Sequence, residues 1–290
     1  MDTGRVNADL TRAARLLHPT GRAASAAEAA RTGAGGGRSA DPVPPEPVTR
    51  TAPRPVGPVI LTQGWRDLAF LHWPADPAAV APLLPPGTEP DLFDGTTYVG
   101  LVPFRMERVG IGRGPAVPYL GTFAETNVRL YSVDRAGRRG VVFRSLEAAR
   151  LIPTLAARLL FALPYQWAAM TLTRHGTPTD PQLRYATRRH RPGRAGTGGT
   201  VHIRIRGRIT DPDPLTDFLT ARWGLHVHWH GRTLYLPNTH PRWPLHHADL
   251  LHHDTNLIPA AGLPAPGGPP VSVLYSPGVK AQFGPPQRCP

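Results

Sequence analysis

Two segments joined by a turn predict a β-hairpin: Thr122-Phe-Ala-Glu-Thr-Asn-Val-Arg-Leu-Tyr131 and Gly140-Val-Val-Phe-Arg-Ser-Leu-Glu147. Because side chains alternate across a strand, Glu125, Asn127 and Arg129 share one face of the first segment. This polar row either faces bulk water, as an exposed hairpin with incidental charges, or lines a cavity that holds a ligand. The sequence therefore indicates a site without naming a reaction.

The turn between the two segments decides which residues face the row. Asp134 to Gly137 suits a type I turn with Gly137 in the left-handed region, followed by a bulge. This register places Glu125 opposite Glu147, and mutual repulsion between two partly buried carboxylates raises the pKa of one of them. A carboxylic acid near an arginine is a candidate proton donor or substrate clamp. We expect Glu125 and Glu147 as catalytic residues, with Asn127, Arg129 and Ser145 binding the substrate.

The composition favours a β-rich or mixed fold. The chain has 290 residues, of which 40% are hydrophobic, enough for a genuine core. Its 36 prolines and 30 glycines predict many short elements and turns rather than long helices. The single cysteine, Cys289, excludes an intrachain disulfide and a cluster of thiolate ligands. No apolar run approaches the roughly 18 residues of a membrane span, so we expect a cytoplasmic protein without membrane contact.

The net charge of +13 raises the question of a nucleic-acid partner. Nearly all of this charge is arginine, a bias that needs no partner. The densest cluster, Arg184 to Arg194, runs into a loop, and no zinc-finger or aromatic RNA-binding pattern accompanies it. A basic interaction module remains an alternative only if this cluster forms a continuous stripe with Arg204 and Arg206.

Three regions are expected along the chain. Residues 1–57 are rich in Ala, Gly, Arg and Pro without an aromatic residue, and they predict a disordered extension. Residues 58–284 form one domain, and residues 285–290 a flexible tail. Alternation and turn signals predict strands at Asp67–His72, Thr97–Phe104, Tyr165–Arg174, Leu183–Arg189, Thr200–Ile209, Leu225–Trp229 and Thr233–Pro237. Helices are predicted after Asp76-Pro77 and Asp213-Pro214 and over Leu151–Leu163.

This pattern predicts an α+β fold with a few short helices and an antiparallel sheet that forms either a curved sheet or a barrel. The histidines His226, His228 and His230 alternate as metal ligands on a strand would, but they equally fit a solvent-facing edge, and we expect no metal. His240 lies in a loop that Trp243 and two prolines make rigid. No P-loop, nucleophile elbow or dinucleotide fingerprint is present, so no cofactor is expected.

From about residue 61 to residue 284 the chain resembles the YqjF-like family of uncharacterised bacterial proteins, the domain-of-unknown-function 2071 family. The matching stretches are His72-Trp-Pro74, Leu83 to Gly87, Asp91 to Gly95, Tyr98 to Phe104, Glu125 to Arg129, Phe143 to Glu147, Leu163-Pro-Tyr165, His240 to Leu245 and Tyr275 to Val279. The family is similar in fold to acetoacetate decarboxylase, which implies an α+β fold in which a strongly curved antiparallel sheet forms a barrel-like or cone-like domain, with a few short helices, around a central pocket. Under this analogy Glu125 resembles the pocket glutamate, and Tyr165 and His240 join the expected ligand-binding residues.

One departure limits the chemistry that the resemblance implies. Acetoacetate decarboxylase works through a Schiff-base lysine, whereas the only lysine here is Lys280, at a place where relatives look to carry an acidic residue. Lysine-dependent decarboxylation is therefore not expected. The expected ligand is a small polar or carboxylated organic molecule. Cofactor-independent lyase or isomerase chemistry and non-catalytic ligand binding both remain open, as does the oligomeric state.

Overall fold

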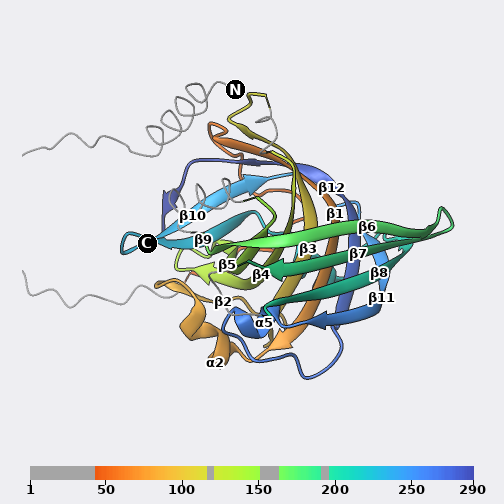
Figure 1. Ribbon diagram of the computed structural model, residues 1–290. Helices are drawn as coiled ribbons and strands as arrows, with labels where there is room; N and C mark the ends of the chain where they lie inside the picture. The colour runs from red at the N-terminus through yellow and green to blue at the C-terminus, as the bar shows by residue number, and fades with distance from the viewer. Residues whose placement is uncertain (1–42, 116–120, 151–162, 191–195) are drawn as a thin grey trace, which may run out of the picture.

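The computed structural model describes residues 43–115, 121–150, 163–190 and 196–290. Most of the described chain is β-strand, and the helices are short (Figure 1). The strands are β1 (Leu61–Ala75), β2 (Thr88–Pro90), β3 (Thr97–Ile111), β4 (Phe123–Asp134), β5 (Arg139–Ala148), β6 (Tyr165–Thr177), β7 (Asp180–Arg189), β8 (Gly198–Arg208), β9 (Gly224–Trp229), β10 (Arg232–Thr239), β11 (His246–Thr255), β12 (Ser272–Phe283) and β13 (Gln287–Arg288). The helices are α2 (Pro77–Val80), the 3-10 turn η1 (Ala81–Leu83), α4 (Pro214–Thr220) and α5 (Leu257–Ala260).

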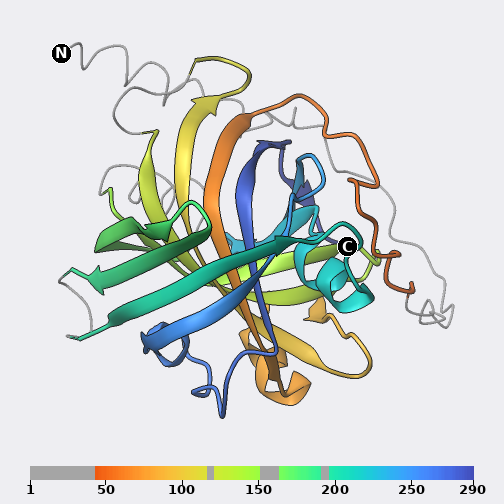
Figure 2. The same ribbon diagram turned by 90° about the vertical axis from the view of Figure 1, so that its right-hand side faces the viewer.

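All these strands belong to one sheet that closes on itself twice. The first circuit runs β5-β6-β7-β8-β11-β12-β1-β3-β4 and returns to β5; the second runs β5-β9-β10-β12-β1-β3-β4. Figures 1 and 2 show the resulting strong curvature. Each pairing is antiparallel except β5 with β6 and β5 with β9. The predicted α+β fold class with a strongly curved, barrel-like sheet is confirmed, with these two parallel pairings as the difference.

Both circuits share five strands, β12, β1, β3, β4 and β5, and these form the wall between two interiors. On β4, Val128 and Leu130 join a hydrocarbon core that includes Leu183 and Ile203 from the β6-to-β8 side. Side chains on the opposite face of the shared strands, such as Phe70, enter a second apolar cluster and line a cavity together with Leu225 of β9 and Leu236 of β10. Each fully buried aliphatic side chain stabilises the fold by about 1.5–3 kcal/mol. Strand alternation therefore decides which interior each residue enters.

A bulge in the hairpin changes the predicted register. The turn is as expected, because Gly137 has φ 77° and its N–H donates to the Asp134 carbonyl at 2.8 Å. Arg129 also lies opposite Phe143 as expected, but Arg144 is then an extra residue on β5. From Ser145 onward, every β5 residue pairs with a β4 residue one position away from the one predicted. Glu125 lies opposite Ala148 rather than Glu147, and Asn127 lies opposite Leu146 rather than Ser145.

The two helix starts predicted from Asp-Pro pairs are confirmed. The Asp76 carboxylate accepts from the Ala78 N–H at 2.9 Å, and the Asp213 carboxylate accepts from the Thr216 N–H at 2.6 Å. In each helix a proline follows at the first position, where its missing N–H costs nothing. The helix predicted over Leu151–Leu163 lies outside the described residues except for its last one. Within the described part of the chain, no helix is both long and apolar enough to cross a membrane.

Segments at both ends of the described chain lie against the sheet. Residues 43–57 have no regular structure, yet the Arg50 guanidinium pairs with Asp217 at 2.7 Å and the Trp223 indole donates to the Thr49 carbonyl at 2.9 Å. At the other end, β13 pairs with β10. These contacts differ from the disorder expected up to residue 57 and the flexibility expected from residue 285. Prolines lower the entropy that such segments lose on ordering.

Replacing Gly278 with alanine should strongly destabilise the protein. Gly278 on β12 has φ 120°, and an added Cβ would lie 1.9 Å from the Trp65 carbonyl oxygen on β1. We expect the variant to lose about 2–4 kcal/mol of unfolding free energy in denaturant titrations. The matched control is Gly207→Ala on β8, where an added Cβ meets nothing within 4 Å. Equal stability of the two variants would contradict this account of the β1–β12 contact.

Candidate functional site

A cavity of about 120 Å³ lies inside the second circuit, between the shared strands and the β9–β10 hairpin. This volume is close to that of cavities that hold one small ring compound, about 150 Å³. Its walls are mainly apolar and aromatic, which is typical of small-molecule sites. The polar side chains that line it are Gln63, Glu125, Asn127, Arg129, Tyr165, Thr220, Arg222, Asn238 and His240.

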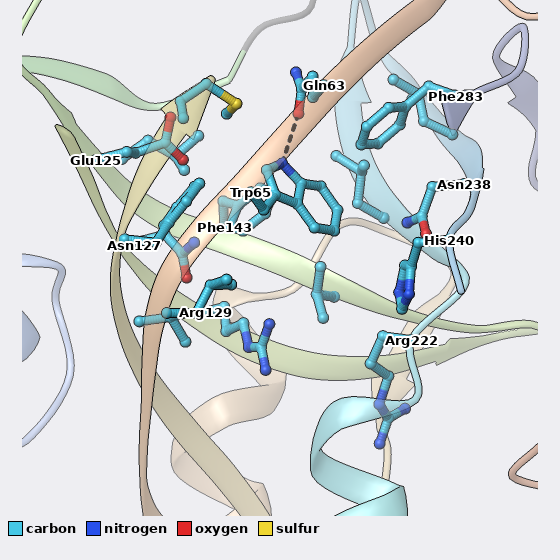
Figure 3. Close-up of a pocket in the computed structure, with 18 of the residues that line it drawn as sticks. Gln63, Trp65, Glu125, Asn127, Arg129, Phe143, Arg222, Asn238, His240 and Phe283 are labelled. Carbon is cyan, nitrogen blue, oxygen red and sulfur yellow. Dashed lines mark hydrogen bonds between the residues drawn. The ribbon is translucent and has the colours of Figure 1, made fainter. Parts of the chain in front are cut away.

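The polar row of β4 forms one wall of this cavity. Figure 3 shows Glu125, Asn127 and Arg129 in line on one side, Trp65 beside them, and His240 and Arg222 across from them. Glu125 is only 3% exposed and Asn127 5%. The row therefore faces an enclosed cavity rather than bulk water.

The Glu125 carboxyl lies in apolar surroundings. Burial raises its pKa to about 8, although the Tyr165 hydroxyl donates to Oε2 at 3.0 Å, a hydrogen bond that acts in the opposite direction. Burial, followed by the nearby Glu125 charge, raises the pKa of Tyr165 well above its usual value. At neutral pH Glu125 holds its proton, so it is equipped to donate a hydrogen bond or a proton to a ligand.

Arg129 brings a positive charge to the same wall. Its Nε donates to the Tyr131 hydroxyl at 3.1 Å and its Nη2 to the Leu219 carbonyl at 3.0 Å. Among the described residues it has no carboxylate within ion-pair distance. Both acceptors are neutral, so the guanidinium charge remains available to an anionic ligand.

Arg222 is a second guanidinium at the cavity, and no sequence pattern predicted it. Its Nη1 pairs with the buried Asp91 carboxylate and its Nε donates to the Phe218 carbonyl at 2.9 Å. Its Nη2 is buried without a hydrogen-bond partner. Burial lowers the pKa of Arg222, and Asp91 opposes this effect. Arg222 reaches the cavity because the link from α4 to β9 passes there, a tertiary feature without a local sequence pattern.

His240 lines the cavity, as expected for a ligand-binding residue, and is held between aromatic rings. Its ring centroid lies 4.6 Å from that of Trp223 and 4.7 Å from that of Trp243. Burial lowers its pKa to about 4. The neutral ring keeps its proton on Nδ1, because that nitrogen lies 2.7 Å from the Pro241 carbonyl oxygen. Nε2 is then left as a hydrogen-bond acceptor.

Ser145 and Glu147 do not belong to this cavity, which corrects the predicted site. The bulge turns both to the other face of β5, where Glu147 is fully buried and pairs with Arg189 at 2.5 Å. The Ser145 hydroxyl donates to the Glu147 carboxylate. Glu125 and Glu147 therefore do not act as a carboxyl pair, and Glu125 owes its raised pKa to burial alone.

The positions of Lys280, Arg204 and Arg206 bear on two other functions, Schiff-base catalysis and nucleic-acid binding. Lys280 is exposed on β12 and does not line the cavity, so it cannot serve there as a Schiff-base lysine. On the outer face, Arg204 pairs with Asp180 at 3.0 Å and Arg206 with Asp249 at 2.5 Å. In the described part of the chain, acidic side chains thus neutralise Arg204 and Arg206. A nucleic-acid module would instead need these arginines unpaired, in a continuous basic stripe.

Comparison with known proteins gives both a family and a fold. The family model DUF2071, described as an uncharacterized conserved protein, matches residues 62–280. The uncharacterized protein YqjF of Bacillus subtilis (strain 168) is 28% identical over 217 residues, which cover 75% of this chain and 88% of that protein.

Solved structures of similar fold are acetoacetate-decarboxylase-like. The enduracididine biosynthesis enzyme MppR in complex with pyruvate aligns with a TM-score of 0.57 and 16% identity, covering 80% of this chain and 91% of MppR. An acetoacetate decarboxylase-like enzyme from Sphingomonas wittichii RW1 aligns with a TM-score of 0.53 and 16% identity, covering 80% and 94%. At these identities the similarity shows the fold.

The raised pKa of Glu125 predicts how stability depends on pH. The unfolded protein loses the Glu125 proton near its usual pKa of 4.5, while the folded protein keeps it until about 8. Glu125 therefore contributes fully to stability below pH 4.5, and its contribution falls between these values by about 1.4 kcal/mol per pH unit. In Glu125→Gln the unfolding free energy, measured by denaturant titration at a series of pH values, should lack this decrease. Parallel curves for the two proteins would show that Glu125 ionises normally.

Proposed function

The chain belongs to the DUF2071 family of uncharacterized conserved proteins, and from that premise we propose that its cavity binds a small organic molecule carrying a carboxylate or carbonyl group. Arg129 binds the anionic or carbonyl oxygen. Glu125 approaches the same ligand as a protonated acid, and Asn127 lies between them. Tyr165 fixes the Glu125 carboxyl, and His240 supplies a hydrogen-bond acceptor on the opposite wall.

One observation carries this proposal: a buried, protonated carboxyl shares one face of β4 with a guanidinium that has no carboxylate partner among the described residues. A cation in an apolar cavity is stabilised when an anion shares its hydrogen bonds. A ligand carboxylate meets this need for Arg129 and leaves Glu125 neutral. The pyruvate bound by MppR, a protein of similar fold, belongs to the same chemical class.

This arrangement supports acid/base chemistry without a cofactor. Near pH 8 about half of Glu125 is ionised, so its carboxylate can remove a proton from the carbon next to a carbonyl and then return that proton to the enolate. Arg129 stabilises the negative charge on the enolate oxygen, which is the chemistry of lyase and isomerase steps. The second candidate function, ligand binding without catalysis, is favoured by the location of Glu147, which leaves Glu125 as the only carboxyl among the described residues that line the cavity.

Arg129→Gln should weaken binding of small carboxylates. We expect affinity to fall about 10- to 100-fold, because charge-assisted hydrogen bonds contribute about 1.5–3 kcal/mol. Calorimetric titration with a panel of carboxylates, beginning with pyruvate, measures the change. Arg184→Gln is the matched control, since Arg184 is exposed on β7 outside the cavity. Unchanged affinity in Arg129→Gln, or no binding across the panel, would overturn the proposal.

Proton exchange distinguishes the enzyme from the binding protein. In D₂O near pH 8, where about half of Glu125 is ionised and can accept a proton, an acid/base enzyme should accelerate loss of the pyruvate methyl proton signal, because enolisation exchanges those protons with solvent. Glu125→Gln should abolish this acceleration while retaining affinity within about 10-fold. Proton NMR follows both quantities. Binding by the wild type without accelerated exchange of any bound carbonyl compound would select the non-catalytic alternative.

A further inference from the structure

Three potential metal ligands meet on the outer side of the β9–β10 hairpin, away from the cavity. They are Asp134 at the end of β4, His226 on β9 and Cys289 just after β13, and their ligand atoms all lie within 4.8 Å of one another. None of the three lines the cavity. We propose that this cluster is a Zn²⁺ site that fastens the C-terminal segment to the domain.

The His226 imidazole points to this use. His226 is 1% exposed, and its buried Nε2 has no hydrogen-bond partner in the part of the chain that the structure describes. The nearest carboxylate oxygen, Oδ2 of Asp134, lies 3.5 Å away, too far for a good hydrogen bond. Two ligands at about 2.0–2.1 Å from a tetrahedral zinc ion lie about 3.4 Å apart, so the observed separation fits shared coordination.

The nitrogen of His226 that would not bind the metal, Nδ1, is held in place by a hydrogen bond, as in most metal-bound histidines. Nδ1 of His226 lies 2.8 Å from the Ser132 hydroxyl, which fixes the ring and directs Nε2 at the cluster. Asp134 therefore lies on the Nε2 side of the ring and Ser132 on the Nδ1 side. The ligand atoms of Asp134, His226 and Cys289 lie within 4.8 Å of one another, which is the arrangement of ligands around an ion.

The donor set selects zinc among the common metal ions. A thiolate, an imidazole and a carboxylate form a mixed soft and hard set that suits Zn²⁺, whereas Mg²⁺ and Ca²⁺ prefer oxygen ligands. Water supplies the fourth position. Binding exchanges the thiol proton for the metal: the Cys289 S–H bond breaks, the proton passes to solvent and a Zn–S bond forms. The thiolate and carboxylate then balance the charge of the ion.

Arg138 is the charged neighbour that this site must accommodate. It donates Nε to Oδ2 of Asp134 at 2.7 Å, and its backbone N–H donates to Oδ1 at 3.0 Å. Its guanidinium also donates to Gln287 Oε1 at 3.0 Å and to the Arg288 carbonyl at 3.2 Å. These bonds orient the carboxylate from outside and hold β13 in place, the role of a residue that supports a metal ligand.

Cys289 is held close to the other two ligands by the backbone. Its N–H donates to the Thr233 carbonyl at 3.0 Å, and β13 pairs with β10 through Leu234 and Tyr235. The thiol is therefore presented by a hydrogen-bonded strand rather than by a free tail. A zinc ion here would join β4, β9 and the C-terminal segment, elements distant in the sequence.

Metal binding by the full-length protein, freed of metal with a chelator and dialysed, tests the proposal. We expect one tightly bound Zn²⁺ per chain by elemental analysis and a rise of about 5 °C in melting temperature. Co²⁺ in place of zinc should give a thiolate-to-cobalt charge-transfer absorption, which only Cys289 can supply. Cys289→Ser should lose this band and the thermal shift while melting normally without metal.

A control variant distinguishes the cluster from general metal binding by histidines. His252→Asn removes an exposed histidine on β11, far from Cys289 in the sheet order, and should retain the zinc stoichiometry, the cobalt band and the thermal shift. Full zinc stoichiometry in Cys289→Ser, or no stoichiometric zinc and no cobalt–thiolate band in the wild type, would overturn the proposal.

Discussion

Strand alternation in the wall formed by β12, β1, β3, β4 and β5 is the constraint on which the molecule depends. The wall belongs to both closed circuits of the sheet, so every second side chain enters one interior and the rest enter the other. Hydrocarbon such as Val128 and Leu130 fills the first interior. The second interior receives Glu125, Asn127 and Arg129 from the same strand. A single strand thus builds a core and a binding cavity at once.

The electrostatics of the cavity follow from this placement. Removing the Glu125 carboxyl from water disfavours its ionised form, and the one hydrogen bond from Tyr165 does not compensate. The hydrogen bonds of Arg129 go to neutral oxygens of Tyr131 and Leu219, and no carboxylate of the described residues lies within ion-pair distance of it. The acid remains protonated and the cation remains unneutralised within one apolar enclosure. Such a pair of groups is suited to hold an oxygen-rich ligand and to move a proton.

Sequence patterns predicted those features of the fold and the site that depend only on residues close together in the chain. The Gly137 turn, the helix starts after Asp76 and Asp213 and the polar face of β4 each depend on a few neighbouring residues. The bulge at Arg144 does not, because it bends β5 within a sheet whose closure depends on distant strands. Its one-residue shift moved Ser145 and Glu147 out of the predicted site. The resemblance to a known family supplied the barrel, which alternation alone leaves open.

Cavity residues from the β9–β10 side were hard to foresee for the same reason. Arg222 and Asn238 line the cavity only because β9 pairs in parallel with β5 and β10 pairs with β12. Contacts of the segment from residue 43 to residue 57 likewise depend on a surface that forms only after folding. The arginines and prolines of this segment predicted disorder, whereas Arg50 forms an ion pair with Asp217 in the first turn of α4.

The most direct measurement of the central claim is the protonation state of Glu125, followed by infrared absorption of the protonated carboxyl group across the pH range. The account predicts a carboxylic acid signal in the wild type at pH 7 that disappears with a midpoint near 8 and is missing from Glu125→Gln. If every carboxyl in the wild type has lost its proton by about pH 6, Glu125 is not enclosed in an apolar cavity and the account is wrong.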